Sequence, residues 1–170
     1  MKALIISLII LTSCLSSEAK QSDQDTTYYQ SADLHKFDGT WEYTDSSITF
    51  KIILKTEKTL LKGSTNYLDL VTGYHIYVKN QKVIQSSIGK AKTIKNGFYL
   101  DKDVSKNKIR FLFTDLGRET PIHGTLELLP TGELKWSVKN LEGVRLNVPG
   151  INEKDHNIYI PTDLILKKVN

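Results

Sequence analysis

The stretch ITFKIILK, residues 48–55, decides the fold class of this protein. Its apolar side chains occupy every second position from Ile48 to Leu54, while the positions between them carry mainly threonine and lysine. Successive side chains of an extended chain point to opposite faces, so a period of two gives one apolar and one polar face. The stretch therefore predicts a half-buried antiparallel strand with Phe50 and Ile52 facing the core.

The same alternation recurs on both sides of this stretch, which predicts further strands of the same kind. The apolar members of the sets are Trp41 and Tyr43; Leu68, Leu70, Tyr74, Ile76 and Val78; Ile109, Phe111 and Phe113; Ile122, Leu126 and Leu128; Leu134, Trp136 and Val138; and Leu164 and Leu166.

Turn-forming residues separate these sets, and no segment shows a sustained helical period. The predicted turns are Asp45-Ser46, Asn80-Gln81, Asn96-Gly97, Asn107 and Pro130-Thr131-Gly132. We therefore predict an all-β domain, an antiparallel meander of eight or nine strands that forms a barrel, with a sandwich as the alternative. Gly73 interrupts one strand, and we expect a bulge or bend there that curls the sheet.

The amino-terminal segment has the pattern of an export signal. Lys2 gives a positive start, and the apolar run ALIISLIIL at residues 3–11 is too short to cross a hydrocarbon layer of roughly 30 Å. The next residues, LTSC at 11–14, resemble the bacterial lipobox, which implies a diacylglyceryl group on Cys14 and cleavage before it. Cys14 is the single cysteine, so no intrachain disulfide can form.

Two alternatives to lipidation remain open. Ser17-Glu18-Ala19 has the small-x-small form of an ordinary signal peptidase site, which would release a secreted protein starting at Lys20. The cysteine could also be a coincidence in an uncleaved segment. The lipobox reading places the protein in the bacterial cell envelope, lipid-anchored at the outer membrane on its periplasmic or surface side.

The predicted organisation has three parts: a signal peptide at residues 1–13, a lipidated cysteine and flexible tether at 14–36, and one all-β domain at 37–170. Residues 15–36 are rich in Ser, Gln, Asp and Thr and show no periodicity. The formal net charge is +4, with single lysines spaced between acidic residues. This pattern is typical of solvated strand faces, and it excludes an arginine-rich nucleic-acid footprint.

The start of the domain, FDGTW at residues 37–41, resembles the Gly-x-Trp motif of the lipocalin first strand. The resemblance implies that Trp41 plugs one end of a barrel and packs against a basic residue of the last strand. Lys167 and Lys168 are the candidates for that basic residue. The second lipocalin motif is approximated by residues 114–116, Thr-Asp-Leu, which lack its aromatic residue.

A broader resemblance covers most of the chain after the tether. It is carried by FDGTWEY at 37–43, FKIILK at 50–55, YHIYVKNQKVI at 74–84, EGVRL at 142–146 and PTDLILK at 161–167. Together these segments resemble a family of uncharacterised exported lipoproteins of the Bacteroidota, known as a domain of unknown function. The resemblance implies a host group and no activity.

The sequence gives no sign of catalytic or metal-binding chemistry. The histidines, His35, His75, His123 and His156, lack the short spacing of a preformed metal pair, and we expect them at the surface or bonded to neighbours. No serine lies in a Gly-x-Ser-x-Gly elbow. We therefore predict no catalytic residues, no metal and no cofactor, and a protein that is not an enzyme.

One segment imitates the start of a calcium loop, with oxygen-bearing side chains at alternate positions: Asp101, Asp103, Ser105 and Asn107. Lys106 stands where the loop needs glycine, and Leu112 stands where it needs a bidentate glutamate. We therefore interpret this segment as a solvated turn.

Residues 140–161 are long for a connection in a compact β domain. We predict a ligand or partner loop there, formed by Arg145, Leu146, Val148 and Ile151, with an extra edge strand as the alternative. Arg145 would meet an anionic group.

Three functions follow from these features. The first is a membrane-anchored barrel that binds a small apolar or amphipathic ligand or an envelope component. The second is a structural or protein-interaction lipoprotein with a filled core, and the third is an enzyme whose residues converge only in the fold. An internal apolar cavity above about 300 Å³ would favour the first. A packed interior would favour the second, and carboxylates or histidines clustered in a cleft would favour the third. The oligomeric state is not predicted.

Overall fold

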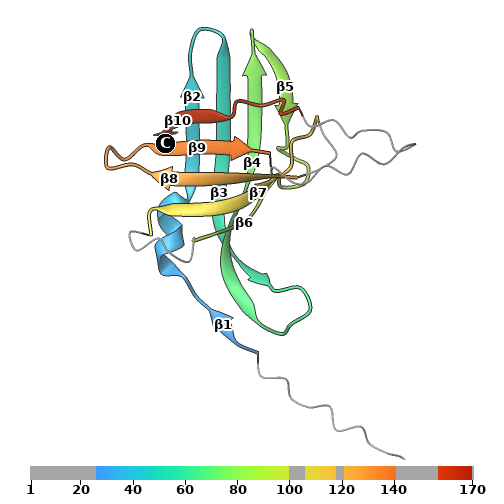
Figure 1. Cartoon of the computed structure of the whole chain (residues 1–170), viewed down its shortest axis with the longest axis vertical. Helices are drawn as coiled ribbons and strands as arrows, with labels where there is room; N and C mark the ends of the chain where they lie inside the picture. The colour runs from blue at the N-terminus through green and yellow to red at the C-terminus, as the bar shows by residue number, and fades with distance from the viewer. Residues whose placement is uncertain (1–25, 100–105, 118–120, 141–156, 170) are drawn as a thin grey trace, which may run out of the picture.

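The computed structural model describes residues 26–99, 106–117, 121–140 and 157–169 of the chain (Figure 1). In these ranges the helical content is one 3-10 helix, η1, and nothing there is long and apolar enough to span a membrane as a helix. The elements are β1 (Tyr28–Tyr29), η1 (Ala32–Phe37), β2 (Gly39–Thr44), β3 (Ile48–Leu60), β4 (Tyr67–Lys79), β5 (Lys82–Ser86), β6 (Ile94–Tyr99), β7 (Lys108–Phe113), β8 (Ile122–Leu128), β9 (Leu134–Lys139) and β10 (Asp163–Val169).

Eight of the strands form a closed antiparallel barrel. Their order is β4-β3-β2-β10-β9-β8-β7-β6, and β6 pairs with β4 to close the ring. The two remaining strands add to the two ends of β4, β1 in parallel and β5 as an antiparallel hairpin partner. Figure 1 shows β2, β3 and β4 running upright, with β7 to β10 crossing them. The predicted all-β barrel of eight or nine strands is confirmed.

The barrel has two different ends, because connections between antiparallel neighbours alternate from one end to the other. The β7–β8 and β9–β10 connections lie at one end, which we call the loop end. Helix η1 and the β8–β9 turn lie at the other, the η1 end. The β3–β4 hairpin extends past the η1 end, since β3 pairs with β2 only as far as Leu54 and β4 pairs with β6 only from Val71 onward (Figure 1).

Aromatic rings fill the barrel interior. The ring centroid of the buried Trp136 lies 5.0 Å from those of Phe50 and Phe111 and 5.3 Å from that of Phe113. A Cβ at Gly124 would lie 2.2 Å from the Phe111 ring, so glycine is required for this close approach. The inward positions predicted for Phe50 and Ile52 are confirmed.

The predicted inward face of β4 is wrong over its second half. Tyr74 and Ile76 are only half-buried, whereas His75 is fully buried and Tyr77 nearly so. The register explains the reversal: His75 lies opposite Ile52, and directly paired residues in antiparallel strands share a face. Of the two positions expected for the histidines, at the surface or bonded to neighbours, His75 takes the second: it points into the core and is bonded there to Thr93 and Gln85.

Three predicted turns are confirmed, and one is wrong. Asp45 and Ser46 connect β2 to β3, where the Asp45 N–H donates to the Ile48 carbonyl at 2.9 Å. Asn80 and Gln81 adopt positive φ in the tight β4–β5 hairpin, and Gly132 does so in the β8–β9 turn. Asn96 and Gly97 instead lie inside β6, where Asn96 has a φ of 56° and the register shifts. Residues with positive φ occur both in hairpin turns and in β-bulges, so Asn96-Gly97 indicates a bulge within a strand as well as it indicates a turn.

Gly73 lies at an irregularity of the sheet, as expected. The register between β4 and β6 shifts between Val71 and Gly73. A Cβ at Gly73 would lie 2.3 Å from the carbonyl oxygen of Ile53, so the neighbouring strand approaches closer there than any side chain allows.

Part of the predicted tether packs against the barrel. Leu34 and Phe37 of η1 are buried at the η1 end. The Tyr28 hydroxyl donates to Asp69 Oδ1 at 2.6 Å, and the Ser31 backbone N–H donates to Asp69 Oδ2 at 2.9 Å. The polar composition of this segment hid the buried side chains, since a six-residue 3-10 helix is too short to give a periodic signal.

Leu34→Ala should lower the free energy of unfolding by about 3 kcal/mol, because it leaves a cavity among buried neighbours. Leu60→Ala, at a half-exposed position, should change it by no more than about 0.5 kcal/mol. Urea denaturation of the full chain measures both values. Equal effects of the two substitutions would show that η1 contributes nothing to the folded core.

Candidate functional site

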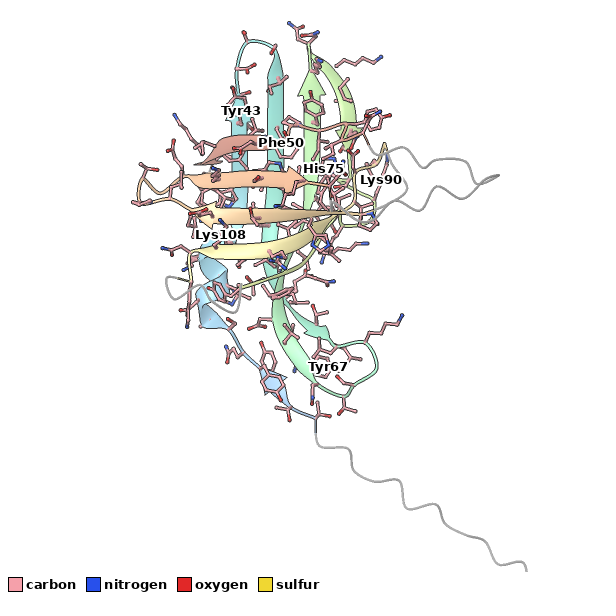
Figure 2. All side chains as sticks on the ribbon, in the orientation of Figure 1. Tyr43, Phe50, Tyr67, His75, Lys90 and Lys108 are labelled. Carbon is pink, nitrogen blue, oxygen red and sulfur yellow. The ribbon has the colours of Figure 1, made fainter. Side chains whose placement is uncertain are left out.

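An open pocket of about 380 Å³ lies at the loop end of the barrel. Its lining comes from three segments that are distant in sequence: β5 with the connection after it, the β7–β8 connection, and the residues before β10. The lining residues are Ile84, Gln85, Ser86, Lys90, Leu116, Gly117 and Tyr159. Figure 2 shows Lys90 on the same side of the barrel as His75, away from the β3–β4 hairpin that carries Tyr67.

The pocket lining is amphipathic. Ile84 and Leu116 are each 45% exposed and Tyr159 is 44% exposed, which is unusual for large apolar side chains gathered in one place. Lys90 is exposed and carries the single charge among the lining residues described. The pocket therefore presents apolar side chains and one positive charge to a ligand.

A buried carboxylate holds the three segments together. Asp115 is fully buried, and its Oδ1 accepts hydrogen bonds from Gln85 Nε2 at 2.7 Å and from the Gly117 backbone N–H at 3.0 Å. Its Oδ2 accepts one from the Tyr159 backbone N–H at 2.7 Å. Hydrogen bonds to an ionised acceptor compensate for lost hydration, so Asp115 fixes the pocket walls relative to one another.

Gly117 allows the two loops to meet. A Cβ at this position would lie 2.7 Å from Tyr159 Cδ2, inside the aromatic ring's contact distance. The ring therefore lies directly against the backbone of the β7–β8 connection.

The network continues from the pocket floor into the barrel core. Because the Gln85 amide nitrogen donates to Asp115, its Oε1 is free to accept from the Leu116 N–H at 3.2 Å and to face His75 Nε2 at 3.3 Å. Nε2 of His75 then carries the proton, and Nδ1, at 2.8 Å, accepts from the Thr93 hydroxyl. Both imidazole nitrogens are satisfied in the neutral form.

Burial lowers the pKa of His75 below its ordinary value of 6.5. The Gln85 hydrogen bond and the Asp115 carboxylate act in the opposite direction and only partly offset the loss of hydration. His75 is therefore neutral at pH 7.

The contact of Thr93 with His75 joins a hydroxyl to an imidazole, the pair that nucleophilic catalysis uses. Thr93, His75 and the neighbouring Ser87 are all buried, however, and no substrate atom reaches them in this arrangement. In the described ranges, no three histidine, cysteine or acidic side chains gather as metal ligands would.

The model of a family of unknown function, DUF6705, matches residues 1–169 of the chain. The chain belongs to this family. Searches of curated proteins and of solved structures gave no match. The expected membership of an uncharacterised family is confirmed, whereas the Bacteroidota host and the lipid anchor stay predictions.

Of the two lysines predicted as candidates to pack against Trp41, Lys168 is the one that contacts its ring. Lys168 Nζ lies 5.2 Å from the centroid of the Trp41 ring, and Trp41 Nε1 donates to the Phe37 carbonyl at 2.9 Å. Gly39 has a φ of 124°, and a Cβ there would lie 2.8 Å from Lys168 Cε. Glycine thus leaves the space that Lys168 needs, while Lys167 is exposed and pairs in register with Glu42.

Several predicted site residues lie outside the described ranges. These are Cys14 and the loop residues Arg145, Leu146, Val148 and Ile151. Asp101, Asp103 and Ser105, interpreted as part of a solvated turn, also lie outside these ranges. The carboxyl end of the predicted ligand loop is described, and its Tyr159 lines the pocket.

Sequence reasoning missed Gln85, Lys90 and Asp115. Asp115 was noted only as part of an incomplete lipocalin motif. The sequence carries no signal for them, because the register that turns His75 inward is set by the partner strand.

Acidification should destabilise the protein through His75. Its folded pKa is depressed, so below about pH 6.5 the unfolded state binds more protons, and the free energy of unfolding falls as the pH drops from 7 toward 5. His75→Gln should flatten this dependence relative to the native protein. Urea denaturation across that range measures the difference, and parallel curves for the two proteins would refute the assignment.

Proposed function

We propose that this protein is a lipid-anchored component of a bacterial cell envelope whose barrel binds, without catalysis, an amphipathic ligand at its loop end. The observation that carries the proposal is the pocket itself: exposed Ile84, Leu116 and Tyr159 gather beside Lys90 over a floor fixed by Asp115. A ligand with an apolar body and an anionic group matches this lining.

The rigidity of the pocket floor supports binding. Gln85 uses its amide nitrogen and its oxygen within the network, so its side chain has one orientation before any ligand arrives. Preorganised polar groups reduce the entropy lost on binding. The pocket volume of about 380 Å³ also falls within the usual range of small-molecule sites.

The filled interior argues for a ligand at the end of the barrel. Trp136 and the three phenylalanines around it occupy the space that a ligand inside the barrel would take. The small-ligand hypothesis thus moves from the barrel interior to the pocket at its rim.

Binding without chemistry fits the same geometry. The hydroxyl–imidazole contact of Thr93 and His75 is shut away from solvent, and the pocket itself offers an amide, a lysine and apolar side chains.

The filled core favours a second candidate as well, an envelope protein as the partner. A peptide segment presenting an apolar side chain and a carboxylate would use the same Leu116 and Lys90 contacts. The exposed Val83 and Ile84 of β5 would extend such a contact along the strand.

The anchor is supported by the sequence alone. The lipobox-like residues 11–14 follow an apolar run of export-signal length. Two or more acyl chains on Cys14 would hold the protein stably at a membrane.

The pocket can be tested with 1-anilinonaphthalene-8-sulfonate, a probe that has an apolar ring system and one anionic group. Its fluorescence should rise on binding, and Lys90→Glu and Leu116→Glu should each weaken the affinity about tenfold, equivalent to roughly 1.4 kcal/mol. Lys82→Glu, on the same strand pair but outside the pocket, should leave it unchanged. Equal affinities for all four proteins would place the probe elsewhere and contradict the proposal.

The anchor can be tested in cells by a matched pair of substitutions. Cys14→Ala should block lipid attachment and leave an unprocessed precursor, while Ala19→Lys, which destroys the alternative cleavage site, should change nothing. Intact-mass measurement of the protein from membrane fractions reads both results. Normal maturation of Cys14→Ala together with failure of Ala19→Lys would establish secretion instead.

A further inference from the structure

The tip of the β3–β4 hairpin is an exposed apolar and basic surface. We define the hairpin tip as Lys58, Leu60, Leu61, Lys62 and Tyr67. Leu60 is 51% exposed and Leu61 38% exposed at the point where the hairpin turns back. Figure 1 shows this hairpin curling past the η1 end, and Figure 2 places Tyr67 there.

Strand β1 adds aromatic side chains to the same surface. Tyr29 is 57% exposed and Tyr28 is 41% exposed, and β1 pairs with the first residues of β4. Lys58 Nζ lies 4.4 Å from the centroid of the Tyr28 ring and 4.6 Å from that of Tyr67. These cation–π contacts hold the strand and the hairpin together as one surface.

The charge of this surface is positive. Residues 58–68 contain Lys58 and Lys62 and no acidic residue. The nearest carboxylates are already engaged: Asp69 accepts from Tyr28 and Ser31, and Glu57 pairs with Lys92. Leucine, tyrosine and lysine side chains in one exposed group are typical of surfaces that enter the headgroup region of a bilayer.

The chain reaches the domain at this surface. The Thr27 backbone N–H donates to Asn66 Oδ1 at 3.3 Å, and the Tyr67 N–H donates to the Thr27 carbonyl at 2.8 Å. Residues 15–25 separate Cys14 from the described chain. A segment of that length reaches at most about 40 Å when extended and spans about 20 Å as a coil. A lipid on Cys14 would therefore keep the hairpin tip within about 40 Å of the bilayer, close enough to rest on it.

We propose that the hairpin tip and β1 rest on the membrane that holds the Cys14 lipid, with Leu60 and Leu61 in the interface and the lysines against anionic headgroups. This inference rests on the proposed lipid anchor. Its consequence is an orientation: the η1 end faces the membrane, and the pocket at the loop end opens away from it. Lys58 and Lys62 are drawn to the surface by its negative potential.

The test uses the full-length lipidated protein in vesicles of phosphatidylcholine and phosphatidylglycerol. Acylation occupies Cys14, so Leu61→Cys provides the only free thiol for an environment-sensitive nitrobenzoxadiazole label. Val83→Cys, at an exposed position of β5, is the matched control. The label at position 61 should shift its emission to shorter wavelengths and be quenched by spin-labelled lipids, and the label at position 83 should do neither.

Charge dependence sharpens the result. The emission shift at position 61 should grow with the phosphatidylglycerol fraction, and Lys62→Glu should remove that dependence, while Lys82→Glu should preserve it. A label at position 61 that stays water-exposed in protein that floats with the vesicles would overturn the orientation and leave the anchor intact. A shift that requires added envelope protein would overturn it in favour of a protein partner.

Failure of the anchor is recognised separately. Protein from its membrane fraction that lacks the acyl mass on Cys14 and does not float with vesicles would overturn the proposed anchor, and this inference with it.

Discussion

β3 and β4 pair over their full length, from Ile48 opposite Lys79 to Leu60 opposite Tyr67. This register determines which side chains enter the barrel, because a slip of one residue would turn every side chain of one strand to the other face. It sets Tyr77 beside Phe50 in the aromatic core and brings His75 inward. The same pairing, continued past the η1 end, creates the hairpin tip.

Bringing an imidazole into an aromatic core requires a compensating network. The His75 ring meets the Phe113 ring edge-on, with centroids 4.9 Å apart, and its two nitrogens are hydrogen-bonded to Thr93 and Gln85. Gln85 then needs a partner for its amide nitrogen, which Asp115 supplies. Removing one member would leave a buried polar group unsatisfied, so core packing and pocket shape depend on each other.

The strands were predictable because a half-buried strand has apolar side chains at every second position, as residues 48–55 do. The inward face of β4 was not predictable, because apolar side chains occupy both faces of this strand. Only its register with β3 determines which face points into the barrel. Helix η1 was not predicted because its six residues are too few to show a helical period. The pocket could not be predicted, because Gln85 of β5, Asp115 of the β7–β8 connection and Tyr159 before β10 meet only in the fold. No spacing in the sequence indicates their meeting.

An up-and-down barrel with a filled interior leaves its two ends as the places where function can differ. Alternation of the connections assigns the amino-terminal entry, η1 and the β3–β4 hairpin to one end, and the β7–β8 and β9–β10 connections to the other. Basic and apolar side chains gather at the first end, beside the chain that leads to Cys14, and the pocket with Lys90 lies at the second. The proposed membrane attachment and the proposed ligand binding would therefore use different surfaces, because the order of the strands places them at opposite ends of the barrel.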